Sequence, residues 1–133
     1  MTDLNDFALN SDTFRLELQD PKTGEILYRD DGEPMTIEVY GEYSDAMRRI
    51  ERKITDRNIA RAQGRRGVNL SAEQLEAQTL ERISASVKSW TIVIGGITPE
   101  VTPASVREIL TSFPWIREQV EAAVYNSKNF MKS

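Results

Sequence analysis

Cysteine and histidine are both absent from this chain of 133 residues. Without them the chain has no disulfides, no zinc site with His or Cys ligands, and no Ser-His or Cys-His nucleophile pair. No serine is followed three positions later by a lysine, which also excludes the Ser-x-x-Lys arrangement of some hydrolases. We therefore expect no enzyme, no cofactor and no metal site, although carboxylate chemistry stays open in principle.

Long hydrophobic runs are missing as well. The most apolar stretch, residues 90–97, is far shorter than the roughly twenty residues that a membrane-spanning helix needs. The first ten residues include Asp3 and Asp6 and no basic residue, so a signal peptide is not expected. The net charge of −4 favours solubility and argues against general attraction to nucleic acid or anionic lipid. We expect a soluble, cytoplasmic protein without a membrane partner.

The N-terminal third has the period of β-strands. Apolar residues alternate with polar ones over residues 13–18 and again over 35–41, which is typical of half-buried strands. A third apolar segment, residues 25–29, lies between two turn sequences that contain proline and glycine. These patterns predict a three-stranded antiparallel meander with strands at about 13–18, 25–29 and 35–41.

About four helices are expected to pack against this meander. Ser44 is a suitable N-cap for a helix at about 45–63, and Ser71 with Gln74 predicts a capping box for a second long helix. The apolar positions of that second helix continue at three- and four-residue steps as Leu80, Ile83, Val87 and Trp90.

Two further signals divide the C-terminal part. Thr102-Pro103 opens a third helix, and Phe113-Pro114 ends it before a last helix at about 115–126. The fold class is therefore α+β with a mainly helical C-terminal part. We expect one domain over residues 12–126, between a flexible N-terminus (1–11) and a C-terminal tail (127–133).

The helix at 45–63 and the loop after it are rich in basic residues. They carry Arg48, Arg49, Arg52, Lys53, Arg57, Arg61, Arg65 and Arg66. Such a surface suits nucleic acid or an acidic partner. No aromatic residue is interleaved for base stacking and the chain is acidic overall, so a protein partner or a second copy of the chain is favoured over nucleic acid.

Two stretches have residue types that also occur in ligand sites. Asp30, Asp31 and Glu33 lack the spacing of a calcium-binding loop, and an exposed hairpin turn is the favoured interpretation. Gly95-Gly96 lacks both the G-x-G-x-x-G spacing and the Lys-Ser/Thr of phosphate-binding loops, which favours a turn.

The C-terminal third, residues 90–130, carries several features in a defined order. Trp90 follows a helix, a loop with Gly95-Gly96 comes next, and Thr102-Pro103 opens a helix that ends in leucine. Then follow the sequence Phe113-Pro114-Trp115-Ile116-Arg117-Glu118-Gln119-Val120 and a closing Asn129-Phe130. In this order and spacing the stretch resembles the C-terminal part of the tail assembly chaperones of long-tailed bacteriophages. The strand-rich N-terminal third is not covered.

The resemblance implies a non-enzymatic role in virion assembly. Proteins of this family are expected to bind the tape measure protein, keep it soluble and recruit tail tube proteins. They act in the host cytoplasm and are not retained in the mature virion. We also expect self-association into an open spiral or another oligomer, because a heterologous contact that does not close gives a spiral.

Partner contacts are expected from the last helix, the tail and the basic loop. The candidate residues are Trp115, Ile116, Val120, Phe130, Arg65 and Arg66. For Phe130 and Met131 in the tail the sequence leaves two alternatives, because this pair either packs back onto the domain or contacts a partner. Two other functions stay open: a small nucleic-acid-binding regulator that uses residues 48–66, and another phage structural protein such as a connector or tail-completion subunit.

Overall fold

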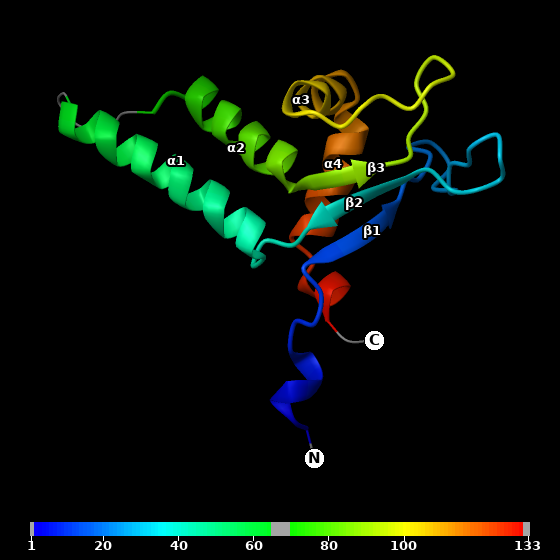
Figure 1. The fold of residues 1–133 in the computed structure, drawn as a ribbon, viewed down its shortest axis with the longest axis horizontal. Coiled ribbons are helices and arrows are strands. Elements are labelled where there is room, and N and C mark those ends of the chain that lie inside the picture. The colour runs from blue at the N-terminus through cyan, green and yellow to red at the C-terminus, as the bar shows by residue number, and fades with distance from the viewer. Residues whose placement is uncertain (1, 65–69, 132–133) are drawn as a thin grey trace.

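The structure, a computed structural model, describes residues 2–64 and 70–131. Within these ranges the chain forms a three-stranded antiparallel sheet and four α-helices, as the α+β prediction requires (Figure 1). The strands are β1 (Thr13–Glu17), β2 (Thr36–Tyr40) and β3 (Val87–Trp90), and the sheet order is β1-β2-β3. The chain therefore leaves the sheet after β2 and returns to it only after two long helices.

The first three helices begin where the capping signals predict, and the fourth begins at Pro114 without a side-chain cap. They are α1 (Asp45–Gly64), α2 (Ala72–Ser86), α3 (Pro103–Ser112) and α4 (Pro114–Val124). The backbone N–H of Met47 donates to the Ser44 hydroxyl, and Ser71 and Thr102 each form both hydrogen bonds of a capping box. These groups satisfy backbone donors that a helix start would otherwise leave unpaired. Short 3₁₀-helices, η1 (Leu4–Phe7) and η2 (Ser127–Phe130), lie near the two ends.

The predicted strand at residues 25–29 is wrong. This segment makes only isolated bridges, Gln19 with Ile26 and Tyr28 with Pro34. Leu27 lies between Leu18 and Met35 in the hydrogen-bonding pattern: its N–H donates to the Leu18 carbonyl, and its carbonyl accepts from the Met35 N–H. The turns on either side, with Gly24 and Gly32 at positive φ, take up the residues that a longer strand would need.

The third strand instead comes from Val87–Trp90, which the periodicity assigned to the second helix. Val87 and Trp90 are both buried although they are three positions apart. The pairing of β3 with β2 shifts between Glu38 and Val39. Glu38 pairs with Ser89 and Val39 pairs with Val87, so Lys88 has no Cα partner in β2. This bulge returns Val87 to the inner face, so a strand here has the spacing of a helix.

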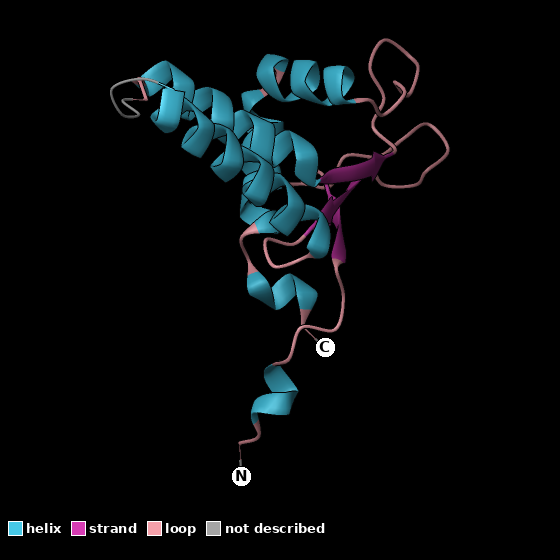
Figure 2. Ribbon diagram, turned by 60° about the vertical axis from the view of Figure 1, so that its left-hand side comes forward, coloured by secondary structure: helices cyan, strands magenta, loops and turns pink. Residues whose placement is uncertain are grey.

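The helices gather on one side of the strands (Figure 2). Helix α4 contacts β1 and β2, α3 contacts α2 and α4, and η2 contacts β1. The buried cluster between them includes Leu18 and Ile37 from the N-terminal part, Ile83 from α2, and Leu110 and Val120 from the last helices. The opposite face of the sheet is polar, and Glu38 there accepts hydrogen bonds from Thr13 and Ser89.

Candidate protein-binding surfaces

Three of the predicted contact residues are part of the core. Ile116 is 4% exposed, Val120 0% and Phe130 3%. Side chains this deeply buried have no surface to present to a partner, so the assignment of these three residues as partner contacts is corrected. Their apolar spacing, from which the assignment came, reflects packing of α4 and η2 against the sheet.

The tail packs back onto the domain at Phe130. Its ring meets Phe14 edge to face with 6.2 Å between centroids, and it covers Gly41 so closely that a Cβ there would lie 3.1 Å from ring atoms. The backbone carbonyl of Phe130 also accepts from the N–H groups of Asn10 and Ser11, at 2.9 and 3.3 Å. Of the two alternatives for the tail, packing onto the domain is therefore the one observed for Phe130.

Of the remaining predicted residues, only Trp115 lies within the described part of the chain. Trp115 is half-buried against the core and meets Phe113 edge to face at 6.3 Å. Arg65 and Arg66 lie outside the described residues. Ile83 and Trp90, two of the apolar positions that the sequence pattern assigned to the second helix, are both buried in the cluster. The Trp90 indole N–H donates to the Pro99 carbonyl at 2.7 Å.

An exposed apolar segment that the sequence analysis did not identify lies at the N-terminus. In this N-terminal arm, residues 2–9, Leu4 is 83% exposed, Phe7 52% and Leu9 45%. Asp3 caps η1 by accepting from the Asn5 N–H at 2.9 Å, so the arm has local structure without burying any side chain of η1. The signal was present in the sequence, as Leu4, Phe7 and Leu9 among aspartates, but it does not distinguish a frayed end from a binding segment.

The basic face of α1 is partly neutralised by α2. Arg57 donates two hydrogen bonds to the Glu81 carboxylate, at 2.9 and 2.8 Å. The other ion pair between the two helices has the opposite sense, because Arg82 of α2 pairs with Glu51 of α1. The hydrogen bonds from Arg57 lower the pKa of Glu81, and the charges of Arg57, Lys53 and Arg107 lower it further. Arg48, Arg49, Arg52, Lys53 and Arg61 are exposed.

A groove of about 480 Å³ runs between α1, α2 and α3. This three-helix groove is lined by Ile50, Lys53, Glu81, Ser84, Ala85, Val87, Val101, Thr102, Pro103, Val106 and Arg107. Its lining is mainly apolar. Lys53 and Arg107 also line the groove, and both residues are exposed to solvent. Within the described residues neither of these two cations forms an ion pair, and the buried Ser84 hydroxyl has no hydrogen-bond partner. The groove therefore combines apolar area with a net positive charge, because Lys53 and Arg107 outnumber Glu81 in its lining.

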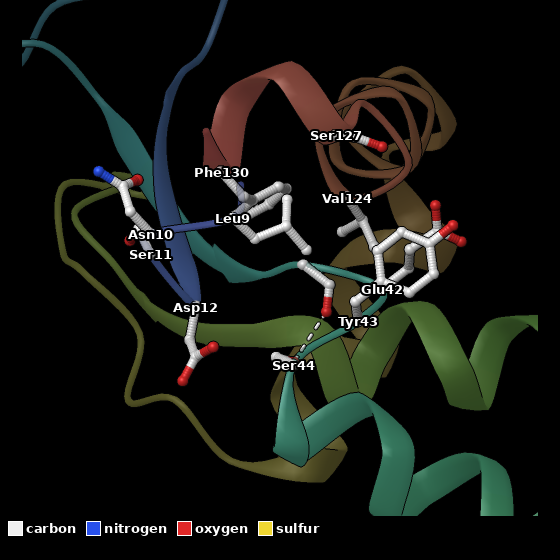
Figure 3. A pocket seen from close by; sticks show the side chains of 11 residues that line it. Leu9, Asn10, Ser11, Asp12, Glu42, Tyr43, Ser44, Val124, Ser127 and Phe130 are labelled. Atoms are coloured by element: carbon white, nitrogen blue, oxygen red, sulfur yellow. Dashed lines mark hydrogen bonds between the residues drawn. The ribbon is translucent and has the colours of Figure 1, made fainter. Parts of the chain in front are cut away.

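A second cavity, of about 240 Å³, lies where the N-terminal segment, the loop before α1 and η2 meet (Figure 3). Asp12, Glu42 and Tyr43 line it beside Leu9 and Phe130. The Ser44 hydroxyl in its wall donates to the Gly41 carbonyl at 2.7 Å and accepts from Met47. Both of these hydrogen bonds belong to the start of α1. Among the described lining residues, no side chain forms a hydrogen bond to the Ser44 hydroxyl, as a general base would need to.

The acidic turn has the geometry of a hairpin turn. The Asp31 carboxylate accepts from the Glu33 N–H at 2.9 Å and from Arg29 at 3.4 Å. Among the described residues no three acidic side chains come together as a metal site. Nor does any helix in the described ranges combine the length and the hydropathy needed to cross a bilayer. Gly95 and Gly96 have φ of 61° and 84°, between the bridged residues Ile94 and Ile97, as the predicted turn requires.

No protein-family model, curated protein or solved structure matches this chain.

Proposed function

We propose that this chain is a non-enzymatic assembly chaperone of the kind that serves long-tailed phages. It binds a tape measure protein, keeps that client soluble and helps to recruit tail tube subunits in the host cytoplasm. It leaves the assembly before the virion is complete. The observation that carries the proposal is the order of sequence features over residues 90–130, from Trp90 through Thr102-Pro103 and Phe113-Pro114 to Phe130.

Two structural observations support this proposal. The residues of the resemblance do not lie scattered on the surface, because they form β3, α3, α4 and η2 around one apolar cluster. Exposed apolar side chains are available outside that cluster, on the N-terminal arm and at Ile59 and Leu75 of the two long helices. A chaperone needs accessible apolar area of this kind on a stable body.

Co-expression with a long helical tape measure protein tests the proposal. We expect the soluble fraction of the client to rise and the two proteins to co-purify, and we expect no such effect on an unrelated coiled-coil protein. Mass spectrometry of purified virions is the second measurement. Failure to bind the client, or retention of the chain in virions at the copy number of a structural subunit, would contradict the chaperone role, and retention would favour a connector or tail-completion protein.

A nucleic-acid-binding regulator is the second candidate, because most cations of α1 are exposed. Fluorescence anisotropy with labelled RNA and DNA across salt concentration tests it, since phosphate contacts give a steep salt slope. Under this alternative, Arg48→Glu with Arg52→Glu abolishes binding, whereas Arg15→Glu with Lys22→Glu, at exposed positions outside α1, serves as a charge-matched control. Absence of binding at low salt excludes the regulator.

A further inference from the structure

We propose that the N-terminal arm of one copy docks into the three-helix groove of a second copy. This inference deepens the proposed function and rests on it for the expectation that the chain self-associates. The arm supplies exposed apolar side chains, Leu4 and Phe7, on a preformed turn. The groove supplies apolar area of matching kind from Ile50, Val101 and Pro103, which line it at partly or fully exposed positions.

Charge complementarity selects this occupant. The arm, residues 2–9, contains Asp3 and Asp6 and no basic residue. In the groove, the Glu81 carboxylate is hydrogen-bonded to Arg57, and among the described residues Lys53 and Arg107 form no ion pair. An acidic, apolar segment thus meets a groove whose lining is mainly apolar and whose net charge is positive. Such complementarity favours the right partner and speeds its encounter.

The positions of the two surfaces make the contact intermolecular. The N-terminus lies at one end of the molecule, below the sheet in both views, whereas α2 and α3 lie at the other end (Figures 1 and 2). The root of the arm is held there, because Asn10 and Ser11 donate to the Phe130 carbonyl. An arm that fills the groove of the next copy leaves its own groove empty. The contact joins two different surfaces; where two copies do not exchange arms with each other, it is heterologous, each added copy presents one free arm and one free groove, and the assembly grows as an open chain.

Two variants of the full chain test the contributions of the arm and of the groove to self-association separately. The arm variant carries Leu4→Ser and Phe7→Ser, both at exposed positions outside the core. The groove variant carries Lys53→Glu and Arg107→Glu, also at exposed positions. A control variant, Leu75→Ser, removes an apolar side chain that is 51% exposed on α2 and lines no part of the groove. Circular dichroism of each variant verifies that it is folded.

Sedimentation velocity over a range of concentrations measures the outcome. We expect the unmodified chain and the control to form a concentration-dependent series of oligomers. Each of the other variants alone should stay monomeric to concentrations at least about 30-fold higher, the loss typical of removing an interface hot spot. High salt should weaken the association of the unmodified chain, because part of the attraction is between charges near the surface.

Mixing the two variants gives the sharpest test. The arm variant still has a groove and the groove variant still has an arm, so together they should form a 1:1 dimer that does not grow further. If the mixture stays monomeric while the unmodified chain oligomerises, or if the arm variant oligomerises normally, the proposal is wrong. A strictly monomeric unmodified chain also overturns it. Client binding in the co-expression experiment is measured separately, so the chaperone role can survive the loss of this contact.

Discussion

In the body of the molecule, which comprises the sheet, α3, α4 and η2, apolar side chains form one buried cluster. The hairpin of α1 and α2 joins this cluster only through α2, where Ile83 is buried in it. Met47 and Ile54 of α1 are buried outside that cluster, and polar pairs join the two helices. Because burial of apolar area stabilises more than exposed ion pairs do, we expect the body to set the global stability. The hairpin should open at a lower free energy than the whole domain.

The largest effect is expected in the body, from Phe130→Ala. The ring is 3% exposed and packs on Phe14 and over Gly41, so its removal leaves a cavity. Loss of a buried phenylalanine costs about 3–5 kcal/mol of the free energy of unfolding, which urea denaturation measures. Phe7→Ala is the matched control, and at an exposed position it should change this value by less than about 0.5 kcal/mol. Similar values for the two variants would show that the tail is not part of the core.

A smaller effect is expected from the buried amide pair in the hairpin. Gln78 is 5% exposed, and its side-chain N–H donates to the Asn58 side-chain oxygen at 2.9 Å. Gln78→Ala should cost about 1–3 kcal/mol, because it removes packing and the hydrogen bond together. The double variant Asn58→Leu with Gln78→Leu should recover most of this loss, because no polar group is then left without its partner. Failure of the double variant to recover stability would mean that the amide pair itself specifies the hairpin.

The two capping boxes offer a direct comparison of hairpin and body. Ser71 caps α2 at the hairpin tip, and Thr102 caps α3 against the core. Either residue changed to alanine should weaken its helix start by about 1 kcal/mol. For Thr102→Ala we expect the loss in global unfolding. For Ser71→Ala we expect it mainly as faster hydrogen exchange of amides in α2, with a smaller change in global unfolding. Equal losses in global unfolding would show that the hairpin and body unfold as one unit.

The smallest effect concerns pH and the pair Arg57–Glu81. The pKa of Glu81 is lowered in the folded state, so the pair stabilises the fold above the unfolded pKa and this contribution is lost as pH falls through the folded pKa. Glu81→Gln should therefore lower stability at neutral pH, and its difference from the unmodified chain should shrink as the pH falls through the lowered pKa of Glu81. Urea denaturation at several pH values checks this, with Glu118→Gln at an exposed position of α4 as the control. A constant difference over the whole pH range would exclude the pair as its cause.

Much of the fold was predictable because its signals are local. A cap such as Ser71 or Thr102 satisfies backbone donors within three residues, and Gly24 and Gly32 supply positive φ at single positions. The strand Val87–Trp90 was not predictable in this way. Its partner Ile37 is far away in the sequence, and the bulge at Lys88 gives its buried residues the spacing of a helix.

The candidate surfaces were less predictable than the fold. An apolar residue near a chain end has the same sequence signal whether it is buried, as Phe130 is, or exposed, as Phe7 is. The difference between them depends on Gly41, which leaves room for the Phe130 ring beside Phe14. The three-helix groove likewise combines Lys53 and Arg107, which only the packing of α1, α2 and α3 brings to one cavity.

The sequence by itself therefore determined the class of fold, the starts of the helices, the turns and the lack of His- or Cys-based chemistry. Each of these depends on residue type or on hydrogen bonds between near neighbours in the chain. Only the tertiary structure decided that β3 completes the sheet, that the tail is core and that the N-terminal arm is exposed. These depend on contacts between distant segments, where the free energy of burial is shared by residues that no local pattern connects.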